Sequence, residues 1–193
     1  MLEILGEFFK GIPSEIYVFI ISILPIVELR GAIPVGAALG LPFYVNFPLA
    51  IIGNLLPIPF ILLFIPKFLD FLARYKTFRP MVLWLRRKAN KHSSKVLGKD
   101  AEVEELKVDD EYLLNSTESA KSLKMSKGIF FALLIFVAVP FPGTGAWTGS
   151  LVASLFNLPK KWSFLAILIG VIAAGIIMSL ASYGVVEFLK FLA

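Results

Sequence analysis

Two charged residues, Glu28 and Arg30, stand between the apolar stretches 16–27 and 31–41. A charged side chain near the centre of a bilayer costs about 2.5–3.5 kcal/mol on insertion scales, so its presence there needs a partner or a function. Arginine stays charged and can bind a phosphate or carboxylate through two hydrogen bonds. A glutamate in a low-dielectric site can exchange a proton near neutral pH. The pair predicts an anion site beside a proton-carrying carboxylate, and the alternative is a structural ion pair that holds a helix break.

A second set of polar residues lies at 139–150, where the sequence reads V-P-F-P-G-T-G-A-W-T-G-S. A helix that begins after this break would direct its positive end at an anion. Hydroxyl groups and an indole ring could contact the same ligand. The candidate residues are Thr144, Trp147, Thr148 and Ser150. In the alternative interpretation, the G-x-x-x-G pair Gly145 and Gly149 only packs two helices closely.

The composition indicates the kind of element that must position these residues. The chain has 193 residues, of which 58% are hydrophobic and 17% are charged, against about 25% charged in a typical soluble domain. Residues 66–127 carry 23 of the 33 charged side chains, so the other 131 residues carry ten. Apolar helices with so few charges have no polar face to present to water. A soluble enzyme, a disordered chain and a disulfide scaffold are therefore excluded, and an integral membrane protein remains.

Other absences narrow the function. The chain has no cysteine, one histidine (His92) and no phosphate-binding loop, so we expect no metal site, no cofactor and no enzymatic activity. The block from Arg74 to Lys99 holds nine basic residues and no acidic one. Beside apolar segments such a block favours the cytoplasmic surface and anionic lipid over nucleic acid. The expected partners are membrane lipids, and a homo-oligomer is possible.

The lengths of the apolar runs predict how they meet a membrane. Residues 43–65 and 164–186 are each long enough to span, because a crossing helix needs about 20 residues. Asn54 interrupts the first span and could face a cavity. Proline and glycine break the shorter runs near their middles, and these break residues are Pro25, Gly31, Pro34, Pro140, Pro142, Gly143 and Gly145. We predict two re-entrant helical hairpins, at 12–42 and 128–158; in a second interpretation every arm is a full span.

The two halves, 1–65 and 128–193, resemble a repeat. Each has a Gly-Ala motif, then a Leu-Pro motif, and a glycine eleven residues after that proline: Gly53 after Pro42, and Gly170 after Pro159. The positive-inside rule places the charged, partly amphipathic linker 66–127 in the cytoplasm, so the halves have opposite orientations. The predicted fold is an all-α integral membrane protein, an inverted repeat of a re-entrant hairpin followed by a transmembrane helix. We expect a multi-pass protein of the cell membrane.

Two motifs carry a family resemblance: P-I-V-E-L-R-G-A-I-P-V-G at 25–36 and A-V-P-F-P-G-T-G-A-W-T-G at 138–149. Together they resemble the small multidrug export protein family, which is usually grouped with the DedA superfamily. The resemblance implies opposed re-entrant hairpins and movement of lipids, including polyprenyl phosphates, with proton or ion coupling. It also implies that Glu28 matches the acidic residue of the first hairpin. DedA proteins carry arginines in the second hairpin motif, whereas this chain has none between Gly128 and Pro159.

Three functional hypotheses follow. The first is a transporter or flippase of an amphipathic anion such as a lipid phosphate, coupled to protons or ions, in which Arg30 holds the head group and Glu28 carries the proton. The second is a proton-coupled multidrug exporter in which Glu28 binds a cation, although Arg30 argues against a cationic substrate. The third is a structural or interaction protein of the membrane whose middle stretch recruits a partner.

Overall fold

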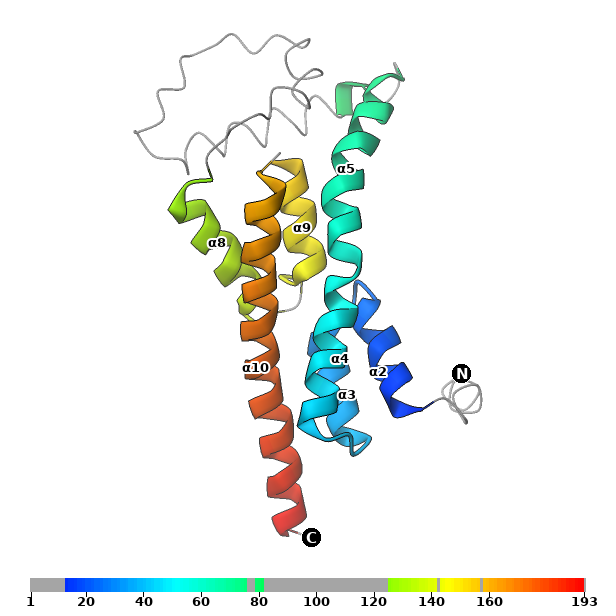
Figure 1. Cartoon of the computed structure of the whole chain (residues 1–193), viewed down its shortest axis with the longest axis vertical. Helices are drawn as coiled ribbons and strands as arrows, with labels where there is room; N and C mark the ends of the chain where they lie inside the picture. The colour runs from blue at the N-terminus through cyan, green and yellow to red at the C-terminus, as the bar shows by residue number, and fades with distance from the viewer. Residues whose placement is uncertain (1–12, 76–78, 82–124, 142, 157, 193) are drawn as a thin grey trace. The chain divides into compact units, whose positions relative to one another are not determined.

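The computed structural model describes residues 13–75, 79–81, 125–141, 143–156 and 158–192. Every regular element within these ranges is a helix, which confirms the all-helical prediction for them (Figure 1). The helices are α2 (Ser14–Ile23), α3 (Glu28–Ala38), α4 (Phe43–Leu55), α5 (Pro57–Ala73), α8 (Lys127–Ala138), α9 (Ala146–Leu155) and α10 (Lys160–Leu192).

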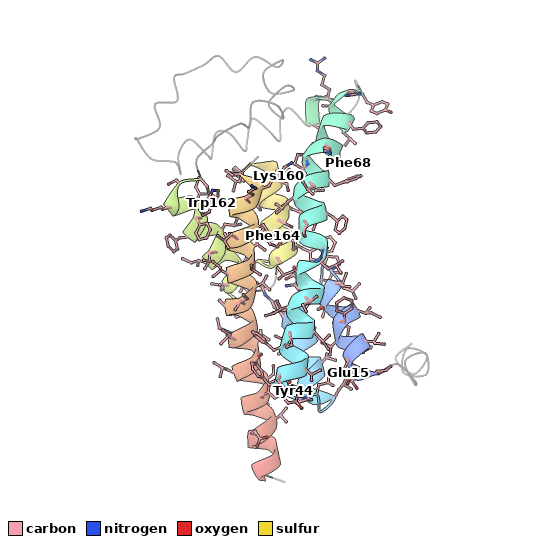
Figure 2. All side chains as sticks on the ribbon, viewed as in Figure 1. Glu15, Tyr44, Phe68, Lys160, Trp162 and Phe164 are labelled. Carbon is pink, nitrogen blue, oxygen red and sulfur yellow. The ribbon has the colours of Figure 1, made fainter. Side chains whose placement is uncertain are left out.

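The chain forms two compact units, and the first comprises Met1–Pro57 and Val171–Ala193. In it α2, α3 and α4 contact one another pairwise. Helices α2 and α3 have 10 and 11 residues, or about 15–17 Å at 1.5 Å per residue, roughly half the hydrocarbon thickness of a bilayer. A short bend with Pro25 joins α2 to α3, and a turn that contains Gly40 (φ 78°) joins α3 to α4. Consecutive members of this trio are therefore antiparallel, and Figure 2 shows Glu15 and Tyr44, in the first turns of α2 and α4, at the same end.

The second unit, Ile58–Gly170, contains most of α5, the short helices α8 and α9, and the first part of α10. Helices α8 and α9 have 12 and 10 residues and contact each other. A Cβ at Gly149 of α9 would lie 2.7 Å from a methyl group of Val137 on α8. The glycine therefore allows the two short helices to approach closely.

The short helices α3 and α9 end in the same way. Leu39 after α3 has φ −77° and ψ 0°, and Phe156 after α9 has φ −81° and ψ 3°. Each of these residues donates its N–H to the carbonyls two and four residues earlier. Two residues further on, Leu41 and Leu158 each donate to a carbonyl five residues earlier, both at 2.9 Å. A proline follows each leucine, and the next helix begins directly after it.

Many large apolar side chains lie on the surface, and several polar side chains are buried, which is the reverse of the pattern in a soluble protein. Large apolar side chains are exposed, for example Ile26 at 93% and Tyr44 at 77%. Buried polar residues are Ser22, Glu28, Asn46, Asn54, Ser150, Ser154, Ser163 and Ser179. Two helical stretches, Phe43–Ala73 and Lys160–Glu187, are long and apolar enough to cross a membrane. An apolar exterior around small polar contacts indicates a membrane protein.

The first of these stretches is longer than expected. The predicted span 43–65 continues as helix to Ala73, and Leu56 between α4 and α5 keeps helical angles (φ −55°, ψ −44°). This last part of α5 contains Lys67 and Asp70. The helix continues past both residues, because a helix that leaves the hydrocarbon can carry charges into water. The expected span 164–186 lies within α10. Most of the linker 66–127, including residues 82–124 of the basic and acidic blocks, lies outside the described residues.

Candidate functional site

The bends of the two short-helix pairs share one backbone feature. Three residues after the proline of each bend, Pro25 or Pro140, the chain enters the left-handed region: Glu28 has φ 53° and Gly143 has φ 86°. Glycine adopts this conformation freely, whereas a residue with a Cβ loses roughly 1–2 kcal/mol. Glu28 is the single non-glycine residue with positive φ in the described part of the chain. A glutamate directly after the first bend therefore has the conformation that a glycine has in the second bend.

Glu28 is also buried, with 5% of its surface exposed, and it begins α3. Its N–H donates to the carbonyl of Leu24 at 2.9 Å across the bend. Arg30, two residues later, is half-buried and interacts electrostatically with Glu28. The first turn of α3 therefore brings together the charged pair expected from the sequence. Strained residues persist where their surroundings hold them, and they concentrate at functional sites.

Asn46 sets the register between α3 and α4. Its Nδ2 donates to the carbonyl of Ile33 at 2.9 Å, and its amide lies against Gly36, where a Cβ would come within 2.5 Å of Asn46 Cγ. Eight residues separate Gly36 from Glu28, and eight separate Asn46 from Asn54. Because α3 and α4 are antiparallel, the same rise of about 12 Å places Asn54 level with Glu28.

Asn54 is fully buried in the last turn of α4, and neither amide atom has a hydrogen-bond partner. Its neighbour Gly53 lies against the end of α2, where a Cβ would be 2.7 Å from the carbonyl oxygen of Phe19 and closer still to Ser22 Oγ. The end of α4 thus lies beside the end of α2, which leads directly into the bend before Glu28. These contacts place Asn54 at the charged end of the first unit.

The predicted residues of the second motif lie in the other unit. Thr144 Oγ1 donates to the carbonyls of Val139 and Phe141, both at 2.9 Å, and so stabilises the bend. Ser150 Oγ donates to the carbonyl of Trp147 at 2.7 Å. Trp147 and Thr148 are half-buried in the first turn of α9. The structure thus brings Glu28, Arg30 and Asn54 to one end of the first unit, while the second-motif residues belong to the second unit.

The break residues fall into two groups. Pro25, Pro140 and Gly143 lie in the bends, and Gly145 directly precedes α9. Gly31 and Pro34 lie inside α3, because the bend comes earlier, at residues 24–27. Pro34 has no N–H to donate to the carbonyl of Arg30 one turn before it. Pro142 lies outside the described residues.

Sequence reasoning missed a second buried polar cluster in the first unit. Asn46 Nδ2 also donates to Tyr183 Oη at 3.0 Å, and the hydroxyl of Tyr183 donates to the carbonyl of Leu41 at 2.8 Å. These bonds connect α10 to α4 and to the turn before α4. The available signal was Asn46 itself, a second amide in an apolar run. In the described ranges no three His, Cys, Asp or Glu side chains are grouped to hold a metal ion.

One comparison with known proteins identifies a family. A family model described as "putative small multi-drug export protein" matches residues 28–177, which is most of the chain. The chain belongs to this family. The match to the small multi-drug export proteins begins at Glu28, so it covers residues 28–36 of the first motif and the whole of the second, together with Asn54. The family description agrees with a role in membrane transport. No curated protein and no solved structure matches the chain.

Proposed function

We propose that this protein is a secondary transporter of an amphipathic anion, such as a lipid phosphate or a small organic acid, and that Glu28 carries the coupling proton. The observation that carries the proposal is the buried Glu28 at positive φ, at a place where the second bend has Gly143. Glycine would avoid the backbone cost, so a role of the carboxyl group accounts for a glutamate at this strained position.

Charge balance favours an anion over a cation. With Glu28 ionised, its charge offsets that of Arg30, with which it interacts. When Glu28 is protonated, Arg30 is left with its positive charge and can bind an oxyanion bidentately. The site is then neutral in both states, as a low-dielectric environment requires. A cation on Glu28 would leave Arg30 uncompensated, so proton and anion bind together.

The architecture that we propose for this transporter is an inverted repeat of two re-entrant hairpins. Three features support it: the half-membrane length of the short helices, the identical ends of α3 and α9, and the positive φ three residues after Pro25 and after Pro140. Basic residues at 74–99 then lie at the cytoplasmic face, where they contact anionic lipid. The protein is a multi-pass transporter of the cell membrane, not an enzyme, and the relation to DedA proteins stays a prediction.

The test is transport in proteoliposomes under an imposed pH gradient. The substrates are a fluorescent lipid with a phosphate monoester head group and, in a separate arm, benzoate. Glu28→Gln should abolish gradient-driven transport, and Arg30→Ala should lower it at least tenfold. Glu15→Gln is the matched control, because Glu15 is an exposed residue in the first turn of α2. Transport by Glu28→Gln at the wild-type rate and with the wild-type pH dependence would refute the proposal.

The family description favours a second candidate, a multidrug exporter. We propose for this candidate that protons drive export and that Glu28 binds a cationic drug. In that case ethidium efflux depends on Glu28 and survives Arg30→Ala, which is the reverse of the pattern expected for an anion. A structural or partner-recruiting role predicts a different result, in which deletion of residues 86–124 abolishes function while both charge substitutions leave it intact.

A further inference from the structure

Two buried asparagines on α4 differ in what they do. Asn46 donates two hydrogen bonds, to Ile33 and to Tyr183, and so holds α3, α4 and α10 together. Asn54 is equally buried, but neither its Nδ2 nor its Oδ1 has a partner. Burial of an amide without hydrogen bonds opposes folding. The polarity of Asn54 therefore contributes nothing to the stability of this unit.

The second half of the chain offers a comparison for the position of Asn54. Gly170, eleven residues after Pro159, lies against α8, where a Cβ would be 2.9 Å from the carbonyl oxygen of Leu134. Gly53, eleven residues after Pro42, lies against the carbonyl of Phe19 on α2 in the same manner. The residue after Gly170 is Val171, which is fully buried. In the proposed repeat, an apolar side chain therefore corresponds to Asn54 of the first half.

The direction of Asn54 follows from its neighbours on α4. At 100° per residue, Gly53 and Asn46 point the same way within about 20°, toward α2 and α3. Phe47 and Ile51 point toward α10, because both lie beside Gly175, which Leu29 of α3 also contacts. Asn54 lies between these two directions and level with Glu28. Its amide is therefore directed toward the first turn of α3, which carries the charged pair.

We propose that Asn54 is a ligand-binding residue that recognises a hydroxyl group next to the oxyanion of the transported molecule. An amide presents a donor and an acceptor side by side, and a hydroxyl beside an oxyanion presents the complementary pair. The hydroxyl donates to Oδ1, and an anion oxygen accepts from Nδ2. This inference rests on the proposed function, in which Arg30 binds the remaining oxygen of the anion, and it narrows the substrate class to hydroxylated anions such as 2-hydroxy acids.

The first measurement separates a ligand role from a structural one. Asn54→Leu replaces an unpartnered amide with an apolar side chain that branches at the same carbon, so the midpoint of thermal unfolding should stay constant or rise. Asn46→Leu is the matched control on the same helix, and its midpoint should fall because Ile33 and Tyr183 lose their donor. A loss of stability in Asn54→Leu as large as that in Asn46→Leu would overturn the proposal, since the amide would then be structural.

The second measurement tests the ligand class with a matched pair of anions. Phenyllactate and phenylpropionate differ only in one hydroxyl next to the carboxylate. Binding to the full-length protein in lipid nanodiscs should be about tenfold tighter for phenyllactate, and the preference should vanish in Asn54→Leu. A preference that survives in Asn54→Leu, or no preference or no binding in the wild type, overturns the inference. The proposed function fails separately, if Glu28→Gln leaves proton-coupled transport unchanged.

Discussion

Replacement of Gly36 by alanine should destabilise the first unit strongly. The new Cβ would lie 2.5 Å from Cγ and 2.7 Å from Nδ2 of Asn46, and closer still to Oδ1, so the amide could not remain in place. The steric cost of such overpacking is typically about 1–3 kcal/mol. Displacement of the amide also weakens its bonds to Ile33 and Tyr183, which are worth on average about 0.6 kcal/mol each between membrane helices.

The expected loss is about 2–4 kcal/mol in the free energy of unfolding, or about 4–16 °C in the unfolding midpoint for a chain of this size. The assay is thermal unfolding of purified variants in nanodiscs. Gly184→Ala is the control, because a Cβ at Gly184 has nothing within 4 Å, and it should be neutral or slightly stabilising.

A double-mutant cycle decides whether Asn46 is the cause. In an Asn46→Ala background the amide is absent, so Gly36→Ala should cost at least about 1 kcal/mol less than it does in the wild type. Full additivity of the two substitutions, or a Gly36→Ala midpoint equal to that of Gly184→Ala, would refute the reasoning.

Three further predictions concern the bends and the contacts of α4 and α10. Glu28→Gly should unfold at or above the midpoint of Glu28→Ala, because glycine adopts φ 53° without the Cβ penalty, and both should lose proton coupling in proteoliposomes; a clearly more stable alanine variant would contradict this. Gly53→Ala should cost about 1–3 kcal/mol in denaturant unfolding, because its Cβ would meet the backbone carbonyl of Phe19; an unchanged midpoint would show that α2 and α4 can separate freely. Tyr183→Phe should cost about 0.6–1.7 kcal/mol through loss of the hydroxyl bond to Leu41, and hydrogen exchange should increase at the start of α4; unchanged exchange there would count against this link.

The sequence predicts most of the helical layout, because run length and proline placement are local properties. Proline at 25 and at 140, together with short apolar runs, indicates two pairs of short helices, and the structure has them. The end of α5 was not predictable from charge, since Lys67 and Arg74 can reach water from the end of a helix. The helix breaks expected at Gly31 and Pro34 do not occur there. Three residues of α3 precede Gly31, and the helix continues past Pro34 to Ala38.

The sequence predicted the charged pair of the candidate site, Glu28 and Arg30, but not the backbone conformation of Glu28. Nothing in P-I-V-E-L-R indicates that Glu28 has positive φ; that emerges only when its bend is compared with the bend at Gly143. Asn46 and Asn54 are likewise equivalent in the sequence. The difference between them depends on Tyr183, which lies 137 residues after Asn46 and becomes its neighbour only in the folded chain.

The division of α10 has a consequence for synthesis of the protein. The second unit, Ile58–Gly170, is continuous in the chain, whereas the first needs both the earliest residues and Val171–Ala193. The helices α2, α3 and α4 leave the ribosome long before their partner Tyr183 exists. During that interval the side chain of Asn46 on α4 must contact lipid, water or another protein in place of Tyr183. The region that contains Glu28 and Asn54 is thus the last part of the molecule to be completed, and a chain that stops before residue 171 would insert but never assemble it.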